Sequence, residues 1–298
     1  MNKNLIRFDW AMKRLLRNKA NFEVLEGFLS ELFREDIKIH KILDSESNKF
    51  DMEDKYNRVD LLAENSGGEI FIIEVQNQNE LDYFHRMAYG TSKVLAEYLD
   101  EGHAYEELKK VYSVNIVYFD LGHGNDYVYK GKNDFRGLHT NEKLVLSDRQ
   151  QFKYKKTEPG EIFPEYYILK VNQFDDIAKD SLDEWIYYFK NNEIKKEFKA
   201  KGLEKAKKIL KYDKLSEKEK KEYHRHIENL RYKASIISTL KTEEEYKIHE
   251  EGKKEGKIEG KTEVILNGVK QGLSVEILEK ISGLTREEIE RILRENPS

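Results

Sequence analysis

Two acidic residues on neighbouring predicted strands are the side chains best suited to chemistry. Residues 58–64 and 70–76 are apolar and rich in β-forming residues, and the turn-like sequence between them predicts a β-hairpin. If the loop is 66–68 with a glycine in the left-handed position, Asp60 lies opposite Glu74. Facing Cβ atoms are about 5 Å apart, so the two carboxylates repel each other. A divalent cation between them would remove that repulsion, which points to a metal site and phosphodiester chemistry.

The predicted strand that carries Glu74 changes character along its length. One face of residues 70–78 is apolar, whereas the other turns polar at Glu74 and Gln76. Open α/β sheets bind ligands at the ends of their strands. Hard cations such as Mg²⁺ prefer a few carboxylates and several waters. Asp60, Glu74 and the main-chain carbonyl of Val75 would suit such an ion.

Composition narrows the class of protein. The chain has 298 residues, of which 37% are charged and 38% hydrophobic, so part of it is expected to be extended helix or tail. It contains no cysteine, which excludes disulfides and cysteine-based zinc sites. No apolar stretch approaches the length of a membrane span, and the N-terminus lacks the apolar core of a signal peptide. We therefore expect a soluble, cytoplasmic protein without a membrane partner.

Charge is distributed unevenly along the chain. The net charge is −4, and it divides into roughly −9 for residues 1–194, roughly +7 for 195–261 and roughly −2 for the remainder. An acidic body that contains a carboxylate cluster, followed by a basic segment, is compatible with nucleic-acid binding. A solvated, lysine-rich helix is the alternative for the basic residues Lys205, Lys207, Lys208 and Lys211.

The expected body is an α/β arrangement around a mixed sheet. Beside the hairpin, hydrophobic periodicity predicts strands at 37–42, 111–121, 125–130, 142–147 and 164–171. The same analysis predicts helices at 9–18, 21–35, 80–100 and 175–191. Residues 1–192 are therefore expected to form one α/β domain.

The remaining residues predict an all-helical C-terminal extension. Residues 193–262 form a charged helical segment, and a glycine at every fourth position over 251–261 predicts a frayed or hinge-like linker, with a dimer contact as the alternative. Residues 263–298 predict a small helical hairpin whose second helix begins with a capping box at Thr285 and Glu288. We favour a docking or capping hairpin over a DNA-reading helix-turn-helix, because the second helix is acidic.

An Asp on one hairpin strand and a Glu-x-Gln at the end of the next resemble the PD-(D/E)XK nuclease superfamily. More narrowly, the chain resembles the recombination-promoting nucleases and transposases of bacteria. The segments that carry the resemblance are Phe8-Asp9-x-x-Met12-Lys13, Val59-Asp60, Ile73-Glu74-Val75-Gln76, Phe84-His85-Arg86-Met87-Ala88-Tyr89, Gly102-x-x-Tyr105, the strand Tyr112–Phe119, and the Glu-Gly-Lys tail with Leu284-Thr285-x-Glu287-Glu288-Ile289.

This resemblance implies a restriction-endonuclease-like core and a metal-dependent DNA endonuclease. Carried over, Asp60, Glu74 and Val75 hold Mg²⁺, or another divalent ion such as Ca²⁺ or Mn²⁺. Gln76 takes a position commonly held by lysine, and a neutral amide can position water but cannot supply charge. Arg86 is therefore added to the catalytic residues as the cation, since a guanidinium fork suits phosphate.

Other roles remain open for several of these residues. Gln76 is either a water-positioning residue or a structural amide. Arg86 either serves the site or forms an ion pair with Glu74 or Asp82, and Lys93 is a second candidate cation on the same helix. Asp9 is expected to cap the first helix, with a role in the site as the alternative.

Two further functions compete with an endonuclease that acts in recombination or on mobile elements. The first is a DNA-binding or assembly module on a nuclease scaffold with weak catalysis, which the glutamine and the basic segment favour. The second is an interaction protein that forms homo-oligomers through its C-terminal helices.

Overall fold

The computed structural model describes residues 5–43, 60–98 and 104–296. Packing divides the chain into two compact units, Met1–Lys221 and Glu222–Ser298. The first unit extends past residue 192, where the sequence analysis placed a domain boundary, and it includes the helix α6 (Leu203–Ile209).

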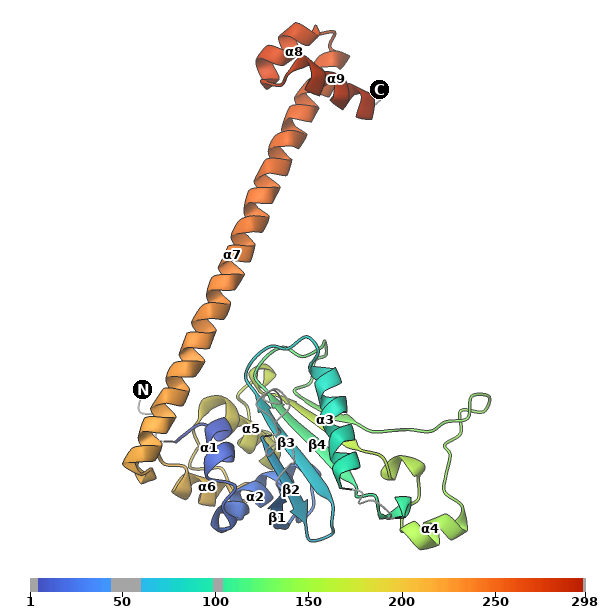
Figure 1. Cartoon of the computed structure of the whole chain (residues 1–298), viewed down its shortest axis with the longest axis vertical. Coiled ribbons are helices and arrows are strands. Elements are labelled where there is room, and N and C mark those ends of the chain that lie inside the picture. The colour runs from blue at the N-terminus through green and yellow to red at the C-terminus, as the bar shows by residue number, and fades with distance from the viewer. Residues whose placement is uncertain (1–4, 44–59, 99–103, 297–298) are drawn as a thin grey trace. The chain divides into compact units, whose positions relative to one another are not determined.

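In the described part of the chain, the first unit contains one mixed sheet of six strands in the order β1-β2-β3-β4-β6-β5 (Figure 1). The strands are β1 (Ile39–Leu43), β2 (Leu61–Asn65), β3 (Ile70–Gln76), β4 (Val111–Val117), β5 (Val128–Gly131) and β6 (Glu165–Lys170). The pairs β1–β2, β2–β3 and β5–β6 are antiparallel, whereas β3–β4 and β4–β6 are parallel. The carboxyl ends of β3, β4 and β6 therefore meet at one edge of the sheet.

The predicted hairpin is present, with the predicted turn. Its ladder ends at the pair Leu61–Ile73, one residue short of the predicted pair Asp60–Glu74, and Asp60 lies just before β2. The loop is 66–68, and Gly68 adopts a φ of 81°, a conformation that glycine reaches without steric cost. The Asn65 side chain accepts hydrogen bonds from the backbone of Gly67 and Glu69, which fixes the loop. Residues 58 and 59 lie outside the described part.

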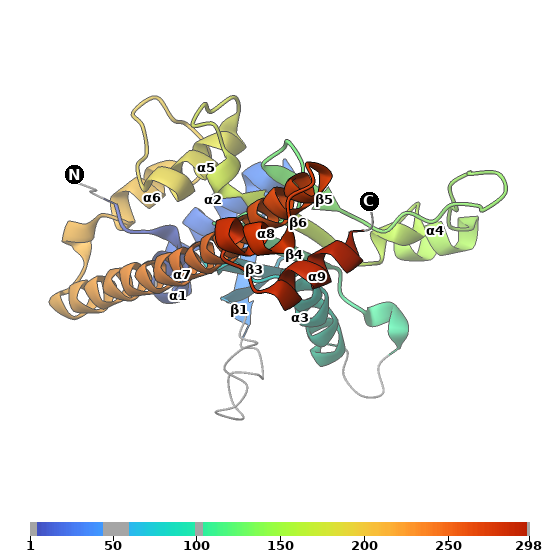
Figure 2. The same cartoon turned by 90° about the horizontal axis from the view of Figure 1, so that it is seen from above.

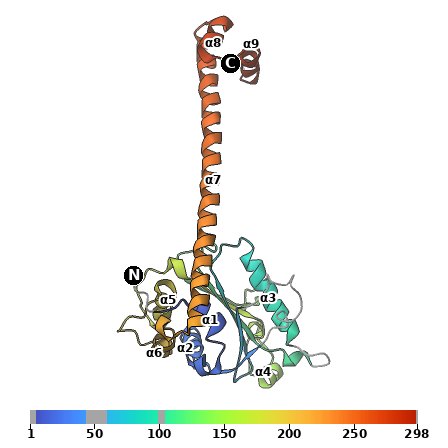
Figure 3. The ribbon, with the colours of Figure 1, turned by 60° about the vertical axis from the view of Figure 1, so that its left-hand side comes forward.

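Helices cover both faces of the sheet. Figure 3 shows α3 (Tyr83–Glu97) on one face and α1 (Phe8–Arg14) and α2 (Phe22–Phe33) on the other. Two apolar clusters attach α3 to the strands beneath it. One cluster includes Val94 and Ile72, and the other includes Met87 and Val117.

Aromatic residues fill the core on the opposite face. Phe8 of α1 packs against Phe28 of α2 and against Trp185 and Phe189 of α5 (Ser181–Asn191), with ring centroids 4.4–6.2 Å apart. Helices α5 and α6 lie beside α2 (Figure 2). This packing holds α1, which carries Asp9 and Lys13, firmly against the body.

Most predicted elements of the first unit are confirmed, with shorter bounds. The predicted strand at 142–147 is wrong: within it the structure has only an isolated bridge between Lys143 and Arg136, followed by the short helix α4 (Asp148–Tyr154). The predicted end of the helix near Gly102 lies outside the described residues. Single turns of 3₁₀-helix occur at Lys19–Asn21, Tyr105–Glu107, Pro159–Glu161, Val171–Gln173 and Tyr212–Lys214.

The second unit is helical. Its main element, α7 (Glu217–Lys270), begins in the last residues of the first unit and continues as one α-helix through the glycine-containing stretch, for which the sequence predicts a frayed or hinge-like helical linker. Its last turns pack on α8 (Val275–Ser282) and α9 (Arg286–Glu295) around Ile265, Leu278 and Ile289. The predicted capping box at Thr285 is present. No described helix is long and apolar enough to cross a membrane.

Candidate active site at the end of the hairpin

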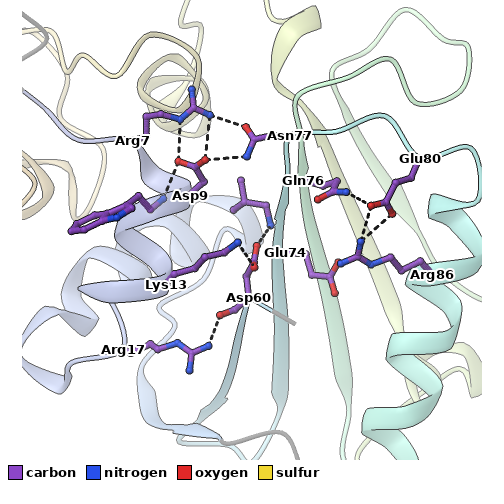
Figure 4. A network of polar contacts seen from close by, with 12 residues as sticks. Arg7, Asp9, Lys13, Arg17, Asp60, Glu74, Gln76, Asn77, Glu80 and Arg86 are labelled. Atoms are coloured by element: carbon purple, nitrogen blue, oxygen red, sulfur yellow. Dashed lines mark hydrogen bonds and ion pairs between the residues drawn. The ribbon is translucent and has the colours of Figure 1, made fainter. Parts of the chain in front are cut away.

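Asp60 is held at the end of the hairpin by contacts from two elements (Figure 4). Its Oδ2 accepts a hydrogen bond of 2.9 Å from the backbone N–H of Val75 in β3. Its Oδ1 lies 2.8 Å from Nζ of Lys13 in α1. The guanidinium of Arg17 donates to the main-chain carbonyl of Asp60 at 2.7 Å. The carboxylate is therefore fixed directly against the strand that carries Glu74.

Glu74 is a buried carboxylate on the α3 face of the sheet, with 9% of its surface exposed. Burial raises its pKa to about 7, and the charges of Asp60 and Glu80 add to this rise, whereas Arg86 opposes it. The Arg86 guanidinium is 3.8 Å from its Oε2. Ionised Glu74 is thus incompletely compensated by the described side chains, so this position favours an added positive charge.

Gln76 and Arg86 are joined through Glu80, which the sequence analysis did not identify. The amide nitrogen of Gln76 donates to Oε1 of Glu80. Nη1 of Arg86 donates to both oxygens of Glu80, at 2.9 and 3.0 Å. Arg86 therefore pairs with Glu74 and Glu80, and Asp82 contributes only a backbone carbonyl to it. Gln76, which occupies the position of the motif lysine, therefore holds Glu80 in place, and Glu80 in turn binds Arg86.

Lys13 is the second site residue that the sequence analysis did not assign. It lies one helical turn after Asp9 on α1, and half of its side chain is exposed. The signal was an aspartate and a lysine four apart at the start of the chain, but no sequence rule connects this pair to a hairpin about 50 residues away. Contact with Asp60 appears only in the folded chain.

Asp9 does not cap α1, so that prediction is wrong: Arg7 is the N-cap residue and Asp9 lies inside the helix. Its carboxylate is 1% exposed and accepts hydrogen bonds from Arg7 at 3.1 Å and from the Asn77 amide at 3.0 Å. Because Asn77 directly follows Gln76, this bond connects α1 to the end of β3. Asp9 therefore helps to hold Lys13 beside the hairpin.

The other basic candidates lie in different surroundings. Lys93 forms an ion pair with Glu97, one turn later on α3, at 3.9 Å. In the basic segment, Lys205 pairs with Glu23 at 3.4 Å and Lys208 with Glu204. These contacts agree with solvated helix surfaces more closely than with a phosphate-binding patch.

Residues 6–240 match the family described as PD-(D/E)XK nuclease family transposase. The chain belongs to this family. No curated protein and no solved structure matches the chain. The match extends from the start of α1 into α7 and thus contains every residue of the network in Figure 4. The fold class expected from the sequence, a mixed sheet flanked by helices with a helical C-terminal region, is confirmed.

PD-(D/E)XK nucleases generally use divalent metal ions, and the donor set of this chain fits one. Among the described residues, no group of three or more His, Cys, Asp or Glu side chains could hold a metal. Asp60 and Glu74 supply two carboxylates beside the peptide of Val75. Mg²⁺ typically binds through one or two carboxylates and keeps several waters. Asp60 and the buried Glu74, whose charge is only partly compensated, supply the carboxylates that such an ion needs.

Proposed function

We propose that this chain is a divalent-metal-dependent DNA endonuclease that hydrolyses phosphodiester bonds during recombination or the movement of mobile elements. The observation that carries the proposal is the buried Glu74 carboxylate, with its pKa near 7, beside Asp60 at the strand end. The membership of the chain in a nuclease and transposase family supports the same conclusion.

Asp60, Glu74 and the carbonyl of Val75 would hold the ion, with Mg²⁺ as the first candidate and Mn²⁺ or Ca²⁺ as alternatives. When bound, such an ion polarises a phosphate oxygen and lowers the pKa of water. The residues of the chain prepare the site for this. Lys13 and the Val75 amide orient Asp60, and the charge of Asp60, which adds to the rise in the pKa of Glu74, supports Glu74 as its partner in the site.

Two cationic side chains, one on each side of the site, take the place of the lysine that is common in this motif. Arg86 approaches Glu74 from α3, and Lys13 approaches Asp60 from α1. Because a guanidinium stays protonated, Arg86 can stabilise a phosphate but cannot accept a proton. The half-exposed amine of Lys13 can donate to a water or to the leaving oxygen. We therefore assign the lysine role to Lys13, and the positioning of Arg86 to Gln76 and Glu80.

The test is nicking of a supercoiled plasmid by the purified full chain with Mg²⁺, Mn²⁺ or Ca²⁺. Asp60→Asn and Glu74→Gln should abolish nicking. Glu64→Gln is the matched control, because Glu64 lies on the same hairpin, is equally buried and is ion-paired with Lys109 at 2.9 Å. Equal nicking by the wild type and both site variants, or no nicking in any metal, would refute the proposal.

A DNA-binding or assembly module with weak catalysis is the second candidate, and the engaged Gln76 amide favours it. Salt-sensitive DNA binding without cleavage would support this alternative. Assembly could use α7, where Ile236, Ile237 and Leu240 are 41–59% exposed. Measuring the mass in solution of the full chain and of the double variant Ile237→Glu, Leu240→Glu tests this, since an unchanged mass would exclude pairing through these residues.

A further inference from the structure

A cavity lies on the α3 face of the sheet, at the carboxyl end of β6. Its volume is about 500 Å³, which is in the range of small-ligand sites. Residues of α3, β5, β6 and the loop that follows β4 line it, including Phe84, Met87, Tyr129, Tyr166 and Lys170. None of these residues belongs to the network around Asp60 and Glu74.

Lys170 is the unusual member of this lining. It is only 2% exposed, and its Nζ donates to the carbonyl of Gly122 at 3.1 Å. The ammonium also lies 5.7 Å from the centroid of the Tyr129 ring. No ion pair joins Lys170 to a carboxylate in the described part of the chain, although buried charges are normally paired. An anionic group bound in the cavity would supply the missing negative charge.

The remaining walls favour a flat ring. Phe84 is 50% exposed on α3, and the Tyr129 and Tyr166 rings face the same cavity from β5 and β6. Aromatic side chains of this kind stack on nucleobases without strong sequence preference. Lys130, which also lines the cavity, is paired with Glu165 at 2.8 Å, so its ammonium already has a carboxylate partner. A ligand with one anionic group and one flat ring fits this lining.

Strand register relates the cavity to the cleavage site. Gln76 pairs with Val117, and Val117 pairs with Lys170. Neighbouring strands are about 4.8 Å apart, so the backbones of Gln76 and Lys170 are about 10 Å apart across the sheet. Tyr166 and Ile168 pack on the apolar cluster beneath α3, and alternation places Lys170 on that same face. The cavity and Glu74 therefore share one face and one edge of the sheet.

We propose that this cavity binds one nucleotide, with its base against Phe84 and Tyr166 and its phosphate at Lys170. The inference rests on the proposed function, because it makes the nucleotide part of the DNA strand that the site cleaves. A base can enter only from single-stranded DNA or after leaving the duplex. The same chemistry would also accept a free deoxynucleoside monophosphate.

The test measures binding separately from cleavage. A fluorescently labelled single-stranded oligonucleotide is titrated with the full chain in EDTA, and dAMP is added as a competitor. Lys170→Met should weaken binding at least about tenfold, the effect of losing one charge-assisted hydrogen bond. Lys110→Met is the matched control: Lys110 is 8% exposed, is paired with Glu165 and precedes β4 at the opposite edge of the sheet. It should change binding less than about twofold.

A second variant and a thermal melt separate binding from folding. Phe84→Ala removes a half-exposed ring and should also weaken binding while the melting temperature stays unchanged. Competition by dAMP would identify a free nucleotide as sufficient, and its absence would assign the pocket to a DNA strand. Unchanged binding in both pocket variants would overturn the inference. Intact, Lys170-dependent binding in a protein that never nicks plasmid would refute the endonuclease alone.

Discussion

Replacing Glu74 with glutamine should change how stability depends on pH in the absence of metal. The pKa of Glu74 is raised from 4.5 to about 7, mainly by burial, and the nearby acids Asp60 and Glu80 add to this rise. Folded protein therefore binds this proton more tightly than unfolded protein does. The stability that Glu74 contributes is fully present below the unfolded pKa and is lost as the pH rises through the folded pKa.

The magnitude follows from this shift. The folded and unfolded values differ by 7 − 4.5 = 2.5 pKa units, which corresponds to about 3 kcal/mol at 1.36 kcal/mol per unit. Integrated between about pH 5 and about pH 8, the contribution of Glu74 to the free energy of unfolding falls by roughly 2 to 3 kcal/mol. Glutamine has nearly the same shape and no proton to lose, so the variant should not show this decrease.

The assay is urea unfolding of the wild type and Glu74→Gln in EDTA across this pH range. As the pH rises, the free energy of unfolding of the variant should increase by roughly 2 to 3 kcal/mol relative to that of the wild type. Glu64→Gln is a control, because the pKa of Glu64 is shifted in the opposite direction and its effect on the pH dependence of stability has the opposite sign. Burial favours the neutral form of Glu64, but Lys109 and Lys41 outweigh it and hold its pKa below the usual value. A constant difference between wild type and Glu74→Gln at every pH would refute the assignment of a charged, poorly compensated Glu74.

Three further outcomes are expected. At about pH 8, Mg²⁺ should raise the unfolding midpoint of the wild type but not that of Glu74→Gln, because an ion stabilises only the state that binds it; equal shifts would place the ion elsewhere. Lys13→Met should reduce plasmid nicking far more than Lys93→Met, since Lys93 pairs with Glu97 on the surface of α3; equal activities would remove Lys13 from the site. Asp9→Asn should lower the free energy of unfolding by about 1 to 3 kcal/mol, because it weakens a buried charge-assisted network; an unchanged midpoint in urea would contradict this.

Local sequence predicted the centre of the candidate site. The hairpin needs only two apolar runs and a loop with a glycine at positive φ, so its register follows from about 15 consecutive residues. That register brings the chain to within one residue of Asp60 and Glu74, whose charges act on each other, and it is the part of the site that sequence could specify. Glu74, Gln76 and Arg86 were expected near one another, and they lie together.

Contacts between distant segments could not be predicted in the same way. Lys13 reaches Asp60, and Asp9 reaches Asn77, because aromatic packing seats α1 against the sheet. The strand predicted at 142–147 failed for a related reason. Leu144 and Val145 have strand-forming side chains, but each is 57% exposed, and within the described residues no strand extends a ladder to them. β-propensity describes fit to a neighbouring surface, and sequence does not show whether that surface exists.

The mixed pairing of the sheet also has a consequence for the order of folding. Asp60 and Glu74 lie at the end of an antiparallel hairpin, a local structure that forms in about 1–10 μs. Lys170 takes its place in the sheet only when β6 pairs with β4, and this parallel pairing needs a long crossover connection. Such non-local pairing is slow. In a refolding experiment, Asp60 and Glu74 should therefore come together early. The cavity at Lys170 should be completed late, when β6 joins the sheet.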